Sequence, residues 1–337
     1  MRFPSVSVVI PSYNRGTLLI EAIESALSQS VVPSEIIVVD DGSTDSTEAL
    51  IEPYRSRIRY VRQQNGGVSS ARNRAIREAS GELIAFLDAD DVWHPRKLEI
   101  QLRILQDHPE LGLLGTDSFD WPTSAEPEVN AEHLGPLVLI TWWQLAVKNH
   151  LTTSSVIVRR WVLDRAGEFD TKMQGPEDRD LWIRVAEIAR VAHLDQPLTG
   201  YRIVPGSVSQ QAETCLAGML RILGKLDDRR AWQGRWLVRR KAYAYVYHAC
   251  SYLYARQRRY FPALGLALRS LACYPLPFKQ GELTSSERTR RAAVILLRWL
   301  RLKGPEPEPY DPSADSPTVG SEPNRLGAST SPLGSVR

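Results

Sequence analysis

Four short segments with strand character alternate with helical segments in the first 90 residues, and this alternation restricts the fold more than any other feature of the sequence. The expected strands are Val6–Ile10, Ile36–Val39, Ile58–Val61 and Leu83–Leu87. Apolar strands with helices between them are typical of a parallel sheet that is covered on both faces. We therefore predict an α/β fold built on a mostly parallel sheet with helices on both faces.

Groups of polar residues follow three of these expected strands, at the point where each strand ends. The groups are Pro11 to Asn14, Asp40 to Ser43, and Asp88 to Asp91. Parallel sheets bind ligands at the carboxyl ends of their strands. Because most of these polar residues are carboxylates, we expect an acidic site at this edge of the sheet.

Asp88, Asp90 and Asp91 form the densest acidic group. Carboxylate oxygens suit a hard divalent cation such as Mg²⁺ or Mn²⁺, and three neighbouring carboxylates repel one another unless a cation compensates them. A metal bridging a diphosphate would neutralise the charge that develops on a departing nucleotide. A loop of solvated acids ahead of Pro95 is the alternative interpretation.

Several residues near the same edge have the chemistry of a nucleotide site. A carboxylate at Asp40 or Asp41 can accept hydrogen bonds from a base or from ribose, and Tyr13 offers a flat face to a nucleobase. Arg72 follows a glycine pair, Gly66-Gly67, and could meet phosphate or base. Each of these also has an ordinary interpretation as a turn, packing or surface residue.

Four charged residues, Glu177 to Asp180, precede an expected helix over Leu181–Ala189. Acidic residues stabilise helix N-termini, so capping is one interpretation. A catalytic carboxylate is the other, because inverting sugar transfer needs a group that removes the acceptor hydroxyl's proton as the new bond forms. The sugar passes through an oxocarbenium-like state, as in glycoside hydrolysis. One carboxylate opposite the leaving group would suffice.

Six segments, in this order and at this spacing, resemble the family 2 glycosyltransferases over roughly residues 4–210. The resemblance implies a GT-A fold with a Rossmann-type sheet, and inverting transfer of a sugar from a nucleotide sugar to an acceptor hydroxyl. A UDP-sugar is the expected donor, and cell-surface polysaccharide or glycoconjugate synthesis the expected role. The segments are Val6–Asn14, Ile36–Asp45, Asn65–Asn73, Gly81–Asp91, Glu177–Trp182 and Tyr201–Ser209.

The resemblance also implies roles for individual residues. Asp178 would be the catalytic base, and Glu177 would line the acceptor side. Asp90 would be the principal ligand of a Mg²⁺ or Mn²⁺ ion, with Asp91 assisting, and Trp182 would pack behind the base. The residues expected to bind the donor nucleotide are Pro11, Tyr13, Asp40, Asp41, Arg72 and Asp88.

One position departs from the family pattern. Many members carry a histidine two residues after the Tyr201-Arg202 pair, where it can ligate the metal or the diphosphate, but this chain has Val204. Because valine cannot ligate a metal, the substitution puts two properties in question: the affinity for the metal and the closing of the 202–209 loop. It leaves Asp90 and Asp178 in place.

The charge of the chain is divided unevenly. Residues 1–213 carry 21 Lys or Arg against 30 Asp or Glu, whereas residues 214–303 carry 19 against 4. From Gly304 onward, Pro, Ser, Glu and Gly dominate, a composition typical of disorder. We expect a catalytic domain over 1–213, a basic helical extension over 214–303 and a disordered tail over 304–337.

The basic extension suggests a partner for the protein. A basic amphipathic surface attracts anionic lipid headgroups, so we predict peripheral membrane contact through residues 229–303. A helical subdomain with a solvated basic face is the alternative. No nucleic-acid partner is expected because no recognised module is present. The acceptor would be a glycan, a lipid-linked molecule or a protein.

Further features bear on the location of the protein. No signal peptide is visible, and no stretch reaches the roughly 18 apolar residues that a membrane span requires. The three cysteines, Cys215, Cys250 and Cys273, are widely spaced, which favours a reducing compartment. We expect a cytoplasmic protein, peripheral at the inner face of the membrane.

Two other functions stay open at this stage. A nucleotidyltransferase would use similar carboxylates but normally shows a Gly-rich basic phosphate loop after its first strand, where this chain has Pro11 to Asn14. A non-catalytic sugar-nucleotide-binding module is the second alternative, and Val204 favours it. The presence of both Asp90 and Asp178 argues against such a module.

Overall fold

The computed structural model describes residues 3–123, 126–129, 134–204, 211–276 and 285–300 of the 337-residue chain. The expected disordered tail over residues 304–337 lies outside these ranges, and so does most of the 202–209 loop. What was expected of these two segments therefore stays a prediction.

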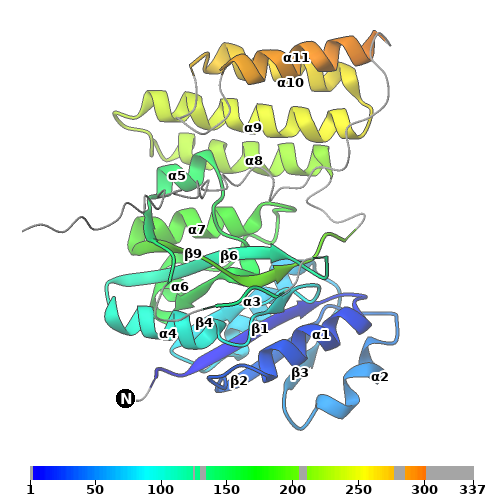
Figure 1. Cartoon of the computed structure of the whole chain (residues 1–337), viewed down its shortest axis with the longest axis vertical. Helices are drawn as coiled ribbons and strands as arrows, with labels where there is room; N and C mark the ends of the chain where they lie inside the picture. Colours follow the sequence, from blue (N-terminus) through cyan, green and yellow to red (C-terminus); the bar gives the residue numbers. More distant parts are fainter. Residues whose placement is uncertain (1–2, 124–125, 130–133, 205–210, 277–284, 301–337) are drawn as a thin grey trace, which may run out of the picture. The chain divides into compact units, whose positions relative to one another are not determined.

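The described strands form one mixed sheet with the order β3-β2-β1-β4-β8-β6-β9-β5, and β7 pairs with β9 (Figure 1). β1 runs parallel to both β2 and β4, and β2 runs parallel to β3. These four strands are the ones expected from the sequence. The strands are β1 (Val6–Ser12), β2 (Glu35–Asp40), β3 (Arg59–Arg62), β4 (Leu83–Phe86), β5 (Val92–Trp93), β6 (Leu111–Asp120), β7 (Leu137–Ile140), β8 (Ile157–Arg159) and β9 (Arg190–Tyr201).

The second half of the sheet departs from parallel order. β8 is antiparallel to both of its neighbours, β4 and β6. β9 is parallel to β6 but antiparallel to β5 and β7. The predicted α/β class is confirmed, and uninterrupted parallel order is confined to the first four strands.

Helices cover both faces of the sheet because alternate residues of a strand point to opposite sides. In β1, Val8 and Ile10 pack in one core with α1 and α4, whereas Val9 packs in a second core with α3 and α7. This covering of both faces was also predicted. The helices of this part are α1 (Gly16–Leu27), α2 (Thr47–Ile51), α3 (Val68–Glu78), α4 (Lys97–Asp107), α5 (Trp142–Val147), α6 (Arg160–Ala166) and α7 (Glu177–Ile188), with short 3₁₀ turns at η1 (Glu52–Tyr54) and η2 (Thr153–Ser155).

The predicted helical C-terminal extension is present and stacks beyond α7, with α8 nearest to it (Figure 1). Ile222 of α8 and Ala242 of α9 belong to the same hydrophobic core as Trp182 of α7. The extension therefore packs directly against the sheet domain. The domain boundary at residue 213 stays a prediction. The helices are α8 (Ala212–Asp228), α9 (Trp236–Arg256), α10 (Tyr260–Cys273) and α11 (Ser285–Trp299).

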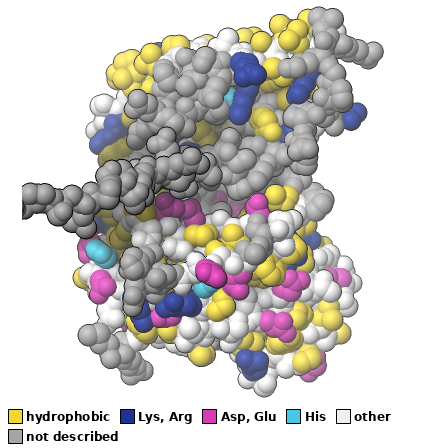
Figure 2. All heavy atoms as spheres, viewed as in Figure 1, with side chains coloured by type: hydrophobic (Ala, Val, Ile, Leu, Met, Phe, Trp, Pro, Cys, Tyr) yellow, Lys and Arg dark blue, Asp and Glu magenta, His cyan; other side chains and the backbone are white. Residues whose placement is uncertain are grey.

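The uneven charge of the sequence reappears on the surface. On the face in Figure 2, most Asp and Glu side chains lie over the part that contains the sheet, and hydrophobic, Lys and Arg side chains gather over the helical extension. Residues 235–300 contain 13 Lys or Arg and 2 Asp or Glu. Within the described ranges, no helix combines the length and apolar character needed to cross a bilayer.

Candidate functional site

The carboxyl ends of β1, β2 and β4 meet at one edge of the sheet. Ser12 at the end of β1 lies level with Asp40 at the end of β2, and β1 also pairs in parallel with β4. The structure therefore brings the three predicted polar groups to the same edge. Pro11 is buried within β1, whereas the Tyr13 side chain just beyond the strand is 46% exposed.

Asp40 is fully buried and fixes the turn after β2. Its carboxylate accepts hydrogen bonds from the backbone N–H of Ser43 at 2.8 Å and from the Tyr60 hydroxyl at 2.5 Å. Burial, and then this hydrogen bond, raise the pKa of Tyr60. Asp40 thus stabilises the turn after β2 from the interior. Its expected contact with a nucleotide stays a prediction.

Asp41 holds a glycine segment against the end of β2. Its carboxylate accepts hydrogen bonds from the backbone N–H groups of Gly66 at 2.9 Å and Gly67 at 2.7 Å. Gly67 has a φ of 84°, which L side chains rarely adopt. The segment can take this path because both positions are glycine. Asp41 therefore positions backbone at the site edge.

Arg72 bridges two acidic residues from different elements. Its guanidinium donates one hydrogen bond to Asp88 beyond β4 and one to Glu177 at the start of α7, each at 2.7 Å. The Phe169 ring lies against it, 5.3 Å from centroid to Cζ. Burial alone would lower the pKa of Arg72, but the charges of Asp88 and Glu177 raise it above its ordinary value. Arg72 is therefore a buried cation that joins the two halves of the site.

Asp90 is as accessible as Asp88, but it has no close ion pair of the kind that Asp88 makes with Arg72. Its side chain is 27% exposed, and Arg15 approaches it at 3.8 Å. Burial, and then the charge of Asp88, raise the pKa of Asp90. Such a carboxylate gains from a cation placed next to it.

Asp91 lies in the interior, and both of its oxygens are hydrogen bonded. One accepts the Ser154 hydroxyl at 2.6 Å and the other the backbone N–H of Arg202 at 3.0 Å. Burial, followed by the charges of Asp90 and Asp88, raises the pKa of Asp91 well above its usual value. Asp91 therefore holds the loop between β4 and β5 through both of its oxygens, and its predicted role as an assisting metal ligand stays a prediction.

The acidic edge offers two partly exposed carboxylates, Asp88 and Asp90, to the expected metal ion. Within the described ranges, no three His, Cys, Asp or Glu side chains are arranged to hold a metal by themselves. The Asp88 and Asp90 side chains are each 27% exposed. Their oxygens fit Mg²⁺ or Mn²⁺ when substrate phosphates complete the coordination, since such ions are commonly bound by one or two carboxylates plus phosphates.

Asp178 lies in the first turn of α7 and is only partly buried. Its Oδ2 accepts hydrogen bonds from Asn149 at 3.1 Å and Thr153 at 3.4 Å. Burial, and then the charge of Glu177, raise its pKa to about 6. A carboxylate with this pKa can accept a proton near neutral pH.

Glu177 is placed differently from its neighbour. It is 6% exposed, and its Oε1 pairs with Arg72. Its Oε2 has no hydrogen-bond partner among the described residues. This burial leaves little of Glu177 for an acceptor to touch, so the placement does not favour the predicted acceptor-side role.

Trp182 packs behind the first turn of α7, as expected. It is fully buried, and its ring centroid lies 5.6 Å from that of Phe86 and 6.1 Å from that of Phe169. Phe86 ends β4, and Phe169 supports Arg72. The aromatic cluster therefore joins the strand that precedes Asp88 to the helix that carries Asp178.

Three residues that hold the site, Arg202, Asn149 and Thr153, were not among those predicted from the sequence. Arg202 donates from Nε to the carbonyl of Asp90 at 3.0 Å and from Nη2 to Glu21 at 2.5 Å. Arg202 lies in Tyr201–Ser209, one of the six segments that resemble the family, and this position could have identified it as a site residue. Asn149 and Thr153 lie outside every matched segment, so no signal identified them.

Comparison with known proteins agrees with this architecture. Residues 7–127 match the family model described as "Glycosyl transferase family 2". An uncharacterized glycosyltransferase of Rickettsia felis is 32% identical over 204 residues, which cover 60% of this chain and 33% of the relative. A chondroitin synthase of Pasteurella multocida is 30% identical over 206 residues, 58% of this chain and 20% of the relative. The chain thus spans a third or less of the length of these two relatives.

Two solved structures share the fold. S. aureus TarS 1–349 in complex with UDP-GlcNAc superposes with a TM-score of 0.52 at 21% identity, covering 80% of this chain and 89% of TarS. The mannosyltransferase PcManGT from Pyrobaculum calidifontis, in complex with GDP-Man and Mn²⁺, gives a TM-score of 0.55 at 19% identity, covering 90% and 81%. At this identity the likeness shows the fold alone.

Proposed function

Because residues 7–127 of this chain belong to glycosyl transferase family 2, we propose that the protein transfers a sugar, with inversion, from a UDP-sugar to an acceptor hydroxyl. The observation that carries this proposal is the Asp88–Arg72–Glu177 bridge. It links the acidic edge of the sheet to the first turn of α7. A candidate base, Asp178, is next to Glu177 on that turn.

Asp178 acts as the general base in this proposal. Its carboxylate accepts the proton of the acceptor hydroxyl while that oxygen bonds to the anomeric carbon and the bond from this carbon to the diphosphate breaks. Asn149 and Thr153 orient the carboxylate through their hydrogen bonds to Oδ2. The pKa of about 6 keeps Asp178 ionised at neutral pH yet basic enough to take a proton.

Asp88 and Asp90 hold the donor end. A Mg²⁺ or Mn²⁺ ion bound to them and to the diphosphate would neutralise the charge on the departing nucleotide. We assign this contact to Asp88 and Asp90 and give Asp91 the task of holding the loop, because both Asp91 oxygens are used by Ser154 and Arg202. The PcManGT complex with Mn²⁺ supports a metal-dependent reaction.

The nucleotide lies along the ends of β1 and β2 in this proposal. The half-exposed Tyr13 ring offers a stacking face for the base. Asp41 contributes through the glycine segment that it holds, with Asp40 fixing the turn beneath. Arg72 contributes by holding Asp88 in place. The TarS complex with UDP-GlcNAc supports a uridine nucleotide.

We further propose that residues 229–303 contact a membrane. Of the 17 exposed large hydrophobic side chains in the described part of the chain, 9 lie within residues 235–300. The same segment has 13 basic and 2 acidic residues. Surfaces that bind anionic lipid commonly combine exposed Trp and Leu side chains with Arg residues. Such contact would bring the enzyme to lipid-linked acceptors of cell-surface glycoconjugates.

A donor screen tests the proposed function. Thermal unfolding is measured with a panel of nucleotide sugars, with and without Mn²⁺, because a ligand that binds the folded state raises the unfolding temperature. Nucleotide release is then measured for each donor that binds. We expect Mn²⁺-dependent release of UDP from one UDP-sugar, abolished in Asp178→Asn.

The two alternative functions give different results when nucleoside triphosphates and candidate acceptors are added to the screen and pyrophosphate release is also measured. A nucleotidyltransferase would release pyrophosphate from a nucleoside triphosphate. A binding module would bind a nucleotide sugar tightly and release nothing from any donor with any acceptor. Either result would overturn the proposal.

A further inference from the structure

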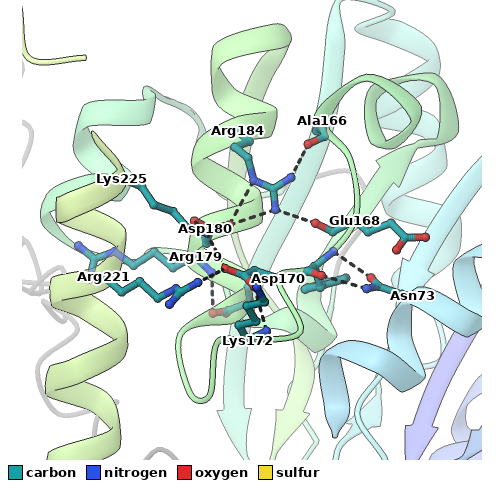
Figure 3. A network of polar contacts seen from close by, with 12 residues as sticks. Asn73, Ala166, Glu168, Asp170, Lys172, Arg179, Asp180, Arg184, Arg221 and Lys225 are labelled. Carbon is teal, nitrogen blue, oxygen red and sulfur yellow. Dashed lines mark hydrogen bonds and ion pairs between the residues drawn. The ribbon is translucent and has the colours of Figure 1, made fainter. Parts of the chain in front are cut away.

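Helix α8 of the basic extension lies along α7, the helix whose first turn carries Asp178 (Figure 3). Three residues of α8 and its C-cap residue contact α7 or the segment before it. They recur at intervals of three and four positions, as residues on one helix face do. The four residues are Gly218, Arg221, Lys225 and Arg229.

Gly218 gives α8 its closest approach to the start of α7. A Cβ atom added at Gly218 would lie 2.5 Å from Cδ of Pro176 and 3.0 Å from the carbonyl oxygen of Gln174. Real Cβ contacts are not this short, so any larger residue would displace Pro176 or α8. Pro176 is the N-cap residue of α7, two positions before Asp178.

Lys225, two turns further along α8, binds the first turn of α7 through an ion pair. Its ammonium group lies 2.9 Å from Asp180 and 2.9 Å from Asp170. Asp180 lies in the first turn of α7 and also pairs with Arg184. The side chain of Asp180 is 5% exposed, so its charge depends on these partners.

The segment before α7 is held by two adjacent residues, Phe169 and Asp170, which contact different helices. Asp170 pairs with Lys225 and with Arg221 of α8 (Figure 3). The preceding residue, Phe169, exchanges two backbone hydrogen bonds, each of 2.9 Å, with the Asn73 side chain of α3. The segment therefore spans from the helix that carries Arg72 to α8.

We propose that α8 positions the catalytic base, with Gly218 and Lys225 as the positioning residues. They fix Pro176 and Asp180, which lie on either side of Asp178 in the first turn of α7. The role of Asp178 as base rests on the proposed function. The extension would then serve the chemical step itself, in addition to any contact with a membrane.

Two glycines of α8 provide a matched test. Gly218→Ala places a methyl group against Pro176, whereas a Cβ at Gly224 would meet nothing within 4 Å. Both changes raise helix propensity alike. We expect Gly218→Ala to lower kcat at least about fivefold with little change in the donor KM, and Gly224→Ala to leave both unchanged.

A second readout does not need activity. The difference in unfolding temperature between the protein and its Asp178→Asn variant, followed from pH 4 to pH 8, reports the titration of Asp178 in the folded state. Glu177, Arg72, Asp88 and the buried Arg179 are the charged groups that act on it. We expect the midpoint to shift in the Gly218→Ala background and to stay fixed in the Gly224→Ala background.

Charge substitutions repeat the test with a second pair. Lys225→Met removes the contact with Asp180, whereas Arg229→Met removes a 2.8 Å pair with Glu187 near the other end of α7. Lys225→Met should lower kcat and Arg229→Met should not. If either variant is unstable, the glycine pair decides the question.

The outcomes separate this inference from the proposed function. If Asp178→Asn keeps full turnover, the proposed base is wrong. If Asp178→Asn is inactive but Gly218→Ala matches Gly224→Ala in kcat and in the midpoint of the Asp178 titration, α8 does not position the base and the inference fails.

Discussion

Arg72 and Glu177 are 105 positions apart in the chain, and their side chains meet at 2.7 Å in the protein interior. The other end of the same guanidinium meets Asp88. One side chain thereby joins the donor edge of the sheet to the turn that carries Asp178. Five predictions test this arrangement and the surfaces around it.

Arg72→Met should lower the free energy of unfolding by about 3–5 kcal/mol, because it leaves the buried Glu177 and the partly buried Asp88 without their cation. Arg74→Met on the same helix is the control. Its pair with Glu78 is largely exposed on the arginine side, so the loss should be about 0–1 kcal/mol. Urea unfolding measures both, and equal losses would contradict the bridging role.

Asp178→Asn should lower kcat by about 10²–10⁴-fold while leaving UDP affinity near that of the parent protein. The amide keeps the shape of the side chain but has one acceptor oxygen in place of two, and it cannot take up the proton. Steady-state kinetics and calorimetric UDP titration separate the two effects. A parallel loss of UDP binding would mean that Asp178 supports the donor site instead.

The pH dependence follows from the raised pKa of Asp178, about 6. Since the base must be ionised, kcat should fall as pH falls through about 6. Stability should move in the opposite direction. A folded-state pKa above the unfolded value of 3.8 adds stability at low pH that is lost as pH rises from about 4 through 6, at most about 3 kcal/mol in all. Asp178→Asn should remove both trends.

Asp90→Asn and Asp91→Asn should have different effects although the residues are adjacent. Asp90→Asn should weaken the activation by Mn²⁺ at least about tenfold, because it removes an accessible anionic ligand. Asp91→Asn should keep the Mn²⁺ response and instead lower the free energy of unfolding by about 1–3 kcal/mol, because the contacts with Ser154 and Arg202 are disturbed. Mn²⁺ titrations of activity, together with thermal unfolding, measure both.

The extension should bind vesicles that contain anionic lipid. Phe261 and Leu268 of α10 are 76% and 54% exposed. Replacing both with Ser should weaken flotation with anionic vesicles about tenfold or more. Val32→Ser, at a residue 73% exposed on the sheet domain, is the control and should have no effect. Absence of flotation at low salt, or flotation with zwitterionic vesicles alone, would rule out this surface.

The sequence predicted the parallel part of the fold well because local patterns determine it. The apolar runs that became β1, β2 and β4 each lead into polar residues, and parallel pairing brings the strand ends together. The helix expected over Leu181–Ala189 instead begins at Glu177. Its first turn is acidic rather than apolar, so the periodicity could not reveal it.

The contacts across the site could not be predicted from local patterns. Arg72 was expected to meet a nucleotide, yet its partners are Asp88 and Glu177. Asp91 was expected at a metal, yet it points inward to Ser154. These pairings depend on tertiary packing between different elements, with partners 16 to 105 positions apart in the chain, and the residues next to each partner give no sign of them.

The order of the site residues along the chain has a consequence for recombination between related genes. The first 91 residues hold every proposed donor contact, and the base and its supports, through α8, come later in the chain. A crossover just after Asp91 would exchange the whole acceptor half in one event and keep the proposed donor contacts together. The hybrid would be active only if the incoming segment supplied an acid to pair with Arg72, as Glu177 does, and an Asp next to it, as Asp178 is. This one ion pair would therefore determine which pairs of segments can form an active enzyme.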